Sequence, residues 1–330
     1  MLEKAVGETP LSCAEVFRAQ HPELEGVSMA YAGRLDPMAS GKLLVLLGEE
    51  CKNQTAYHGL DKEYEFSVLL GIGSDSHDVL GRLTTNPTSQ TTLPLDCALR
   101  AARPSLTQSN GTLSAQLSNK EGSKQLSEGV NHGLAAPSAP EESCLEPSTD
   151  SLLRKNTLSG SLVTVATSLT GNIELPYPHF SAKTVQGKPL HMWTLEGRLD
   201  EIDIPTKEST IYSLQLNSIE TKTRTEVCAE ARAKIDSIPE VTEARKALGN
   251  DFRRVDVRKD WENILQNASL PDAYRIAHFT CLASSGTYMR TLSHLIGQKI
   301  TPATPSLAWS IHRTKIGKYD AVDNSWTTEY

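Results

Sequence analysis

The sequence lacks the patterns that mark several large classes of protein. No apolar run is long enough to span a bilayer, and the first eight residues lack the basic start and apolar core of a signal peptide. We therefore expect a cytoplasmic protein without membrane contact. The six cysteines are scattered and form no Cys-x-x-Cys pair, so reduced cysteines are expected rather than disulfides or a zinc site.

The usual signatures of cofactor and metal enzymes are also missing. The nine histidines are dispersed and no His-Glu-x-x-His occurs, so we expect no metal. The stretch Gly71-Ile-Gly-Ser-Asp75 lacks the full dinucleotide fingerprint, and residues 33–42 lack the glycine spacing of a P-loop. We therefore expect no nucleotide cofactor. A nucleophilic serine or cysteine has no supporting motif either.

Positive charge is scarce relative to negative charge. The chain has 33 Lys and Arg against 40 Asp and Glu, a net charge of −7. This balance argues against a protein coated in nucleic acid, because phosphate contacts require Lys and Arg. It does not exclude a local basic groove. With 330 residues, of which 38% are hydrophobic, the chain can form one large domain or two small ones.

Two segments differ in composition from the rest. Residues 103–157 are rich in Ser, Thr, Gly, Pro, Asn and Gln, and we expect them to form a disordered insertion because they can bury little apolar surface. Residues from about 222 to 270 are charged, and we expect an inserted helical hairpin there. Its basic patch consists of Arg253, Arg254, Arg258 and Lys259. Such a patch is usually a solvated face, and RNA contact is the alternative.

The hydrophobic spacing predicts one helix near the N-terminus and several strands. Thr9-Pro10 predicts a helix that starts at residue 10, while a capping box at Ser12-x-x-Glu15 would start it one turn later. Its expected apolar face consists of Cys13, Val16, Phe17 and Gln20. Strands are predicted at residues 43–47, 63–71, 210–219 and 274–283, and Tyr64 heads the apolar face of the second.

Two further helices are predicted in the second half of the chain. One covers residues 161–171 and ends at Gly171, and the other follows Ser284-Ser-Gly-Thr287 and presents an apolar stripe. Arg290 falls in the first turn of the latter helix, off that stripe. Because the helix dipole disfavours a cation near a helix N-terminus, we expect Arg290 to pair with a carboxylate.

The stretch Gly33-Arg-Leu-Asp-Pro-Met-Ala-Ser-Gly41 places a carboxylate on a stiff turn beside the apolar run 43–47. Pro37 restricts Asp36 to an extended backbone, and the flanking glycines permit tight turns. A carboxylate at the edge of an apolar core is unfavourable unless a cation pairs with it. The alternative is an aspartate that only hydrogen-bonds the backbone of its own turn.

Four stretches, in this order, resemble motifs of the TruB-type pseudouridine synthases. Residues 31–41 are similar to the GxLDPxAxG motif, which carries that family's nucleophilic aspartate. Asp61-Lys-Glu-Tyr64 resembles its DKxY motif, Tyr177-Pro-His-Phe-Ser-Ala-Lys183 its YSAxK segment, and Ser285-Gly-Thr-Tyr-Met-Arg-Thr291 its KGTYIRT motif. The resemblance covers residues from about 3 to 85, 160 to 220 and 272 to 320.

The resemblance implies an α+β fold, the pseudouridine synthase catalytic domain, with a central, largely antiparallel mixed sheet flanked by helices. Residues 1–102 would form its first part and residues 158–330 its second, and we recognise no C-terminal RNA-binding domain. The implied enzyme is an isomerase, a tRNA pseudouridine synthase. It would flip out the uridine at position 55 in the T-loop of tRNA and convert it to pseudouridine. We expect tRNA as the partner, no cofactor, and a monomer.

The resemblance also implies roles for individual residues. Asp36 would be the nucleophile, Arg290 its partner, and Tyr64 the residue whose ring lies against the base. The residues implied in substrate binding are Lys4, Tyr31, Gly33, Arg34, Lys62, Ser181, Lys183, Gly286 and Thr287. Tyr31 occupies a position where the family often has histidine. Two alternatives remain: a pseudouridine synthase that acts on another RNA, mRNA or rRNA, and a non-catalytic tRNA-folding chaperone.

Overall fold

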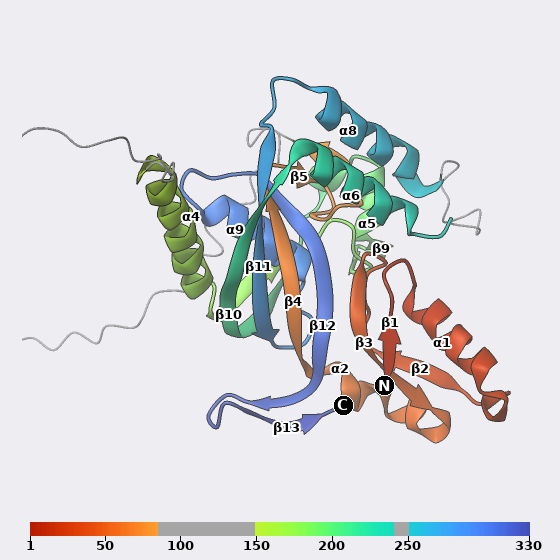
Figure 1. Cartoon of the computed structure of the whole chain (residues 1–330). Helices are drawn as coiled ribbons and strands as arrows, with labels where there is room; N and C mark the ends of the chain where they lie inside the picture. Colours follow the sequence, from red (N-terminus) through yellow and green to blue (C-terminus); the bar gives the residue numbers. More distant parts are fainter. Residues whose placement is uncertain (85–148, 241–250) are drawn as a thin grey trace, which may run out of the picture.

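The computed structural model describes residues 1–84, 149–240 and 251–330 (Figure 1). Within this part, one large sheet contains the strands β1 (Leu2–Lys4), β2 (Met29–Ala32), β3 (Ala39–Leu47), β4 (Asp61–Leu70), β7 (Gly171–Pro176), β10 (Thr206–Thr223), β11 (Ala273–Ala283), β12 (Ser306–Asp320) and β13 (Ser325–Glu329). Their order is β1-β3-β12-β4-β11-β10-β7, with β2 paired to β3 and β13 paired to β12. The pair β3–β12 is parallel and the other pairs are antiparallel. The expected central, largely antiparallel mixed sheet is confirmed.

Helices cover this sheet and extend from its ends. They are α1 (Pro10–Gln20), α2 (Gln54–His58), α4 (Thr149–Ser168), α5 (Leu190–Leu195), α6 (Arg224–Asp236), α8 (Arg254–Gln266) and α9 (Met289–Lys299). Short 3-10 helices are η1 (Pro22–Leu24), η2 (Gly48–Asn53), η4 (Leu199–Glu201) and η5 (Asp251–Arg253). Figure 1 shows α4 beside β10 and α9 behind the central strands, with α6 and α8 paired at one end of the sheet. No described helix combines the length and the apolar character needed to cross a membrane.

The core lies along the central strand β4. Phe66 on β4 and Phe279 on β11 stack with ring centroids 5.4 Å apart, and both are buried. Burial of each such ring contributes about 2–3 kcal/mol. The predicted alternation of β4 holds for its first half, where Tyr64 is buried and Glu65 is exposed. From Phe66 to Leu70 every residue is buried, because strands β12 and β11 flank β4 and helix α9 packs against it.

Helix α1 begins where Thr9-Pro10 predicts. The Thr9 hydroxyl accepts a hydrogen bond from the Ser12 backbone N–H at 3.0 Å, and Pro10 is the first helical residue. The later start at Ser12-x-x-Glu15 is therefore wrong. The predicted apolar face is also wrong in part: Val16 is 50% exposed, and the buried residues are Cys13 and Ala14. The reason is position, since α1 packs against the edge strand β1 along one narrow side.

The other predicted elements are present with shifted ends. The predicted strand 210–219 extends over the whole of β10. The helix predicted to end at Gly171 ends at Ser168, because Gly171, with φ of +102°, begins strand β7 opposite Ile211. This helix, α4, starts at Thr149, inside the segment 103–157 that we predicted to be disordered. Residues 103–148 of that segment, and residues 241–250 of the predicted hairpin, lie outside the described residues.

Candidate active site

Asp36 lies at the tip of the turn that joins β2 to β3. Gly33 opens this turn with φ of +82°, a left-handed backbone that favours glycine. The Asp36 carbonyl accepts the Ala39 N–H at 2.9 Å, which closes the turn at the first residue of β3. The Asp36 side chain is 37% exposed, so its carboxylate is reachable from solvent.

The guanidinium of Arg290 meets this carboxylate. Arg290 Nε donates to Asp36 Oδ2 at 2.7 Å, and the arginine side chain is 5% exposed. The pair predicted for Arg290 is therefore present, although the prediction that Arg290 lies off the buried stripe is wrong. Helix α9 is buried around most of its circumference, because α4 and the sheet enclose it. Burial lowers the pKa of Arg290, but the carboxylates of Asp36 and Asp78 outweigh burial and raise it.

The remaining nitrogens of Arg290 bind two backbone carbonyls. Nη1 donates to the carbonyl of Ser76 at 3.1 Å and Nη2 to the carbonyl of Phe180 at 3.3 Å. These carbonyls belong to two separate segments, the loop between β5 (Gly73–Ser74) and β6 (Leu83–Thr84), and the extended residues after β7. Three parts of the chain thus fix the plane of one guanidinium.

Asp78 is a second carboxylate at this guanidinium. Its Oδ2 lies 3.7 Å from Arg290 Nε, and its Oδ1 accepts hydrogen bonds from Ser76 Oγ at 2.6 Å and from the Leu80 N–H at 3.0 Å. Burial raises the pKa of Asp78, and Arg290 and Ser76 oppose this effect. Asp78 was not among the predicted site residues, because it lies outside the four motifs.

Tyr64 lies on β4, and its position in the sheet is opposite Arg313 of β12 and Cys281 of β11. Its side chain is buried. Burial raises the pKa of the Tyr64 hydroxyl, and the nearby charge of Arg313 opposes that rise. Arg313, opposite Tyr64 in the sheet, also donates to the Arg34 carbonyl, so it links Tyr64 to the turn that carries Asp36.

Arg313 is a further residue that the sequence analysis missed. It is 1% exposed, and it donates to the carbonyls of Lys42 (Nε, 2.7 Å) and Arg34 (Nη1, 3.4 Å). Its third nitrogen, Nη2, has no hydrogen-bond partner among the described residues. Arg313 therefore connects the start of the Asp36 turn to strand β3.

Two predicted substrate-binding lysines are structural in position. Lys4 is buried and its ammonium donates to the Ala39 carbonyl at 2.5 Å, at the base of the Asp36 turn. Lys62 is buried and donates to Ser285 Oγ at 3.1 Å and to the Leu60 carbonyl. Burial lowers the pKa of each lysine to about 8. Neither ammonium faces solvent. Both lysines therefore stabilise the Asp36 turn and the segments packed beside it from inside the protein.

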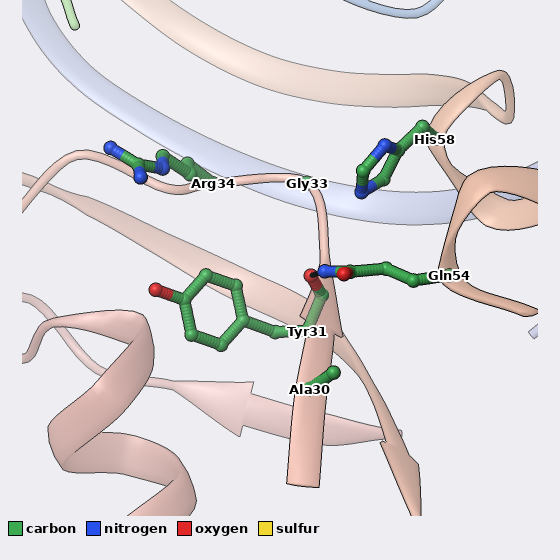
Figure 2. A pocket seen from close by; sticks show the side chains of 6 residues that line it. All are labelled: Ala30, Tyr31, Gly33, Arg34, Gln54 and His58. Atoms are coloured by element: carbon green, nitrogen blue, oxygen red, sulfur yellow. Dashed lines mark hydrogen bonds between the residues drawn. The ribbon is translucent and has the colours of Figure 1, made fainter. Parts of the chain in front are cut away.

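Three other predicted residues line a shallow pocket beside the turn. Figure 2 shows Tyr31, Gly33 and Arg34 in this pocket, with Ala30, Gln54 and His58 completing its lining. The Gln54 amide donates to the Tyr31 carbonyl at 2.9 Å, which ties helix α2 to the turn. Arg34 is exposed, so its guanidinium is open to an anionic ligand.

The last four predicted residues lie on two segments near Arg290. Ser181 is buried, and its hydroxyl has no partner among the described residues. Lys183 is exposed, with its ammonium 5.1 Å from the centre of the Tyr177 ring. Gly286 is exposed with φ of +82°, and the Thr287 hydroxyl donates to the Ser284 carbonyl at 2.9 Å, so these two shape the turn that begins α9.

Three histidines meet next to Arg290. The rings of His77 and His294 stack with centroids 4.1 Å apart and an interplanar angle of 5°, and His179 lies 5.8 Å from His77. Burial lowers the pKa of all three, that of His294 to about 4. Among the described residues, no group of three or more His, Cys, Asp or Glu could hold a metal ion. The rings of His77 and His294 pack face to face in this part of the site.

Comparisons with known proteins agree on one family. A family model described as the N-terminal domain of TruB family pseudouridylate synthases matches residues 23–143. The tRNA pseudouridine synthase B of Caldicellulosiruptor saccharolyticus is 24% identical over 216 residues, which is 66% of this chain and 50% of that protein. The protein of the same name from Bifidobacterium longum subsp. infantis is 24% identical over 98% of this chain and 64% of its own length. The chain therefore spans about half to two thirds of the length of these relatives.

A short, more similar match and a solved structure complete the comparison. The tRNA pseudouridine synthase B of Opitutus terrae is 42% identical over 60 residues, 18% of this chain and 25% of that protein. Among solved structures, the crystal structure of a Cbf5-Nop10-Gar1 complex matches 97% of this chain and 49% of the matched chain, with 14% identity and a TM-score of 0.42.

Proposed function

The chain belongs to the TruB family of pseudouridylate synthases, and from this membership we propose that it isomerises uridine to pseudouridine in tRNA. The proposed target is the uridine at position 55 in the T-loop. The observation that carries the proposal is the pair Asp36–Arg290, a solvent-reachable carboxylate held at 2.7 Å by a buried guanidinium. An adjacent cation favours the ionised form, which is the form that can act as a nucleophile.

The proposed reaction breaks the bond between C1′ of the ribose and N1 of uracil, turns the ring, and forms a bond between C1′ and C5. C5 loses a proton and N1 regains one, so atoms and charge balance without a redox partner. Asp36 is the proposed nucleophile. Arg290 orients it through Nε, while its other nitrogens are occupied by the carbonyls of Ser76 and Phe180.

The target base must leave the RNA stack to reach Asp36, and aromatic side chains commonly hold a flipped base. Tyr64 is the proposed contact for the base, beside Asp36 and backed by Arg313. Exposed Arg34 and Lys183 are the proposed phosphate contacts, since both are cations open to solvent. The buried Lys4 and Lys62 support the turn and are not proposed to touch RNA.

Release of tritium from RNA tests this proposal. The purified protein is incubated with an unmodified tRNA transcript that carries tritium at C5 of uridine, and pseudouridine is mapped by position. We expect release from position 55 that Asp36→Asn abolishes, while RNA binding stays within about tenfold because the lost contribution is chemical. The exposed Asp200→Asn is the matched control and should retain full activity.

Other outcomes separate the rival functions. Release from an mRNA or rRNA substrate but not from tRNA would favour an enzyme of the same chemistry with a different target. Binding and refolding of tRNA without any release, unchanged in Asp36→Asn, would replace the enzyme with an RNA chaperone.

A further inference from the structure

Helices α6 and α8 pack against each other at the end of the sheet, and α8 contacts the loop between β5 and β6. The predicted basic patch on this hairpin is largely engaged within the protein. Arg254 pairs with Asp251, and Arg258 Nε lies 2.7 Å from Asp236 Oδ1. Arg253 is different, because its partners lie outside the hairpin.

Helix α8 holds the second half of the β5–β6 loop. The Asp260 carboxylate accepts hydrogen bonds from Arg82 Nε at 2.7 Å and from the Leu83 N–H at 3.1 Å. The buried indole of Trp261 donates to the Val79 carbonyl at 3.3 Å. These contacts fix the part of the β5–β6 loop that follows Asp78, so the helical hairpin and this loop are packed together.

Arg253 holds the first half of the same loop and also reaches a second segment. Its Nη2 lies 2.5 Å from Asp75 Oδ2, and its guanidinium carbon lies 4.4 Å from the centre of the Phe180 ring. The Arg253 backbone has φ of +70°, a left-handed conformation that residues other than glycine adopt only when their surroundings hold them there. One side chain therefore bridges the loop that contains Asp75 and the segment that contains Phe180.

Both of these segments supply carbonyls to Arg290. Ser76, the residue after Asp75, accepts from Arg290 Nη1, and Phe180 accepts from Nη2. We propose, resting on the function proposed above, that Arg253 is a positioning residue for catalysis. It clamps the two carbonyl-bearing segments together, and they in turn set the plane in which Arg290 presents Nε to Asp36. The helical hairpin thus helps to hold the Asp36–Arg290 ion pair in its geometry.

This geometry makes a specific prediction for Arg253→Gln, which removes both the ion pair and the cation–π contact. We expect kcat for tritium release to fall by about tenfold to a hundredfold, since small misplacements of catalytic groups cost rate steeply, with KM unchanged within about twofold. Arg253→Lys keeps the charge near Asp75 and Phe180, and should restore most of the rate. Asp75→Asn should lower kcat in the same way, and the double variant should be no worse than the single ones.

The matched control is Arg258→Gln in helix α8, which breaks an ion pair with Asp236 of α6 rather than a contact with the β5–β6 loop. Arg258→Gln should leave kcat unchanged, while it should shift the melting temperature by about as much as Arg253→Gln does. The proposal is overturned if Arg253→Gln retains wild-type kcat, or if both variants lose activity equally and in proportion to lost folded protein.

A measurement that does not depend on turnover separates this proposal from the proposed function. The Nε–H resonance of Arg290 can be assigned in a nitrogen–proton NMR spectrum by its absence in Arg290→Lys. We expect Arg253→Gln to move this resonance and Arg258→Gln to leave it in place. If the wild type shows no tritium release from any RNA but the resonance moves as expected, the proposed enzymatic function is wrong, while the positioning role of Arg253 is supported. An unmoved resonance in Arg253→Gln would show that Arg253 does not position Arg290.

Discussion

Tyr64 and Arg313 are the innermost polar neighbours of the site, at opposing positions on β4 and β12. Burial alone would keep the Tyr64 hydroxyl strongly protonated, while the guanidinium of Arg313 favours the phenolate. Burial outweighs the arginine, so the pKa of the hydroxyl stays above its ordinary value. In the proposed reaction, this hydroxyl is the candidate group for moving the proton that leaves C5. The same ring can lie against the flipped base.

Substitution Tyr64→Phe separates these two roles, because it keeps the ring and removes the hydroxyl. We expect product formation to slow by about a hundredfold, in the range typical of a lost acid–base group, while RNA binding changes less than about threefold. Single-turnover rates and filter binding measure the two effects. Tyr57→Phe, which removes an exposed hydroxyl that contacts Glu50, should change neither. An unchanged rate in Tyr64→Phe would remove the catalytic role of its hydroxyl.

At the residue scale, the sequence predicted site residues that belong to a motif. It did not predict site residues that lie outside the motifs and reach the site only through the fold. Asp36, Tyr64 and Arg290 are each marked by local sequence, and the expected pairing of Asp36 with Arg290 is present. Arg313 could not be connected to Tyr64 before the register of β12 against β4 was known. Lys4 and Lys62 were implied in substrate binding by their place in motifs, and no local sequence pattern reveals that both are buried.

At the scale of elements, the turn and strand β3 are held by an unusually close parallel neighbour. Gly41 pairs with Arg313 in the β3–β12 register, and its φ is +106°. A Cβ atom at residue 41 would overlap the backbone of Arg313, including its nitrogen at 2.6 Å. Glycine at this position therefore allows the strand that carries Arg313 to approach the strand that follows Asp36.

We expect Gly41→Ala to destabilise the protein by more than about 2 kcal/mol, because backbone strain and a backbone clash act together. Gly26→Ala is the control, since Gly26 also has positive φ, +75°, but no atom lies within 4 Å of its added Cβ. It should cost about 1 kcal/mol, from strain alone. Urea unfolding midpoints measure both. Equal losses in the two variants would show that the close approach of β12 contributes nothing.

The sequence predicted β3 only from residue 43, where its apolar run begins, whereas the strand starts at Ala39. Its first residues pair with β12, about 270 positions later in the chain, and no local pattern reveals such a partner. The start of a helix was easier to predict where a side chain caps it, as Thr9 caps α1. The end of α4 was wrong because Gly171 serves a strand rather than a helix cap.

At the scale of the whole molecule, the three histidines beside Arg290 join helix α9 to the two segments that supply carbonyls to Arg290. His77 comes from the β5–β6 loop, His179 from the segment after β7, and His294 from α9. The groups that act on them electrostatically include Arg290 on His77 and Asp75 on His179. Neutral rings can stack beside the Arg290 cation, whereas a protonated ring there would be repelled.

This arrangement predicts a loss of stability in mild acid. The pKa of His294 is lowered from its ordinary value of 6.5 to about 4 by burial and by His179. Between these two pH values the unfolded chain binds a proton that the folded chain does not. The free energy of unfolding must therefore rise with pH across this window and fall as the pH drops from 6.5 toward 4. The shift corresponds to about 3 kcal/mol from His294 alone.

Urea unfolding of the wild type and of His294→Gln at a series of pH values tests this prediction. The variant has no proton to take up at residue 294, so its stability should decline less steeply over the same window, by about 3 kcal/mol in total. Near pH 7 the ring is neutral in both folded and unfolded chains, and there the two curves should run parallel. If they run parallel down to pH 4 as well, the buried histidine stack does not couple protonation to unfolding. The acid sensitivity of the protein would then have to come from its carboxylates.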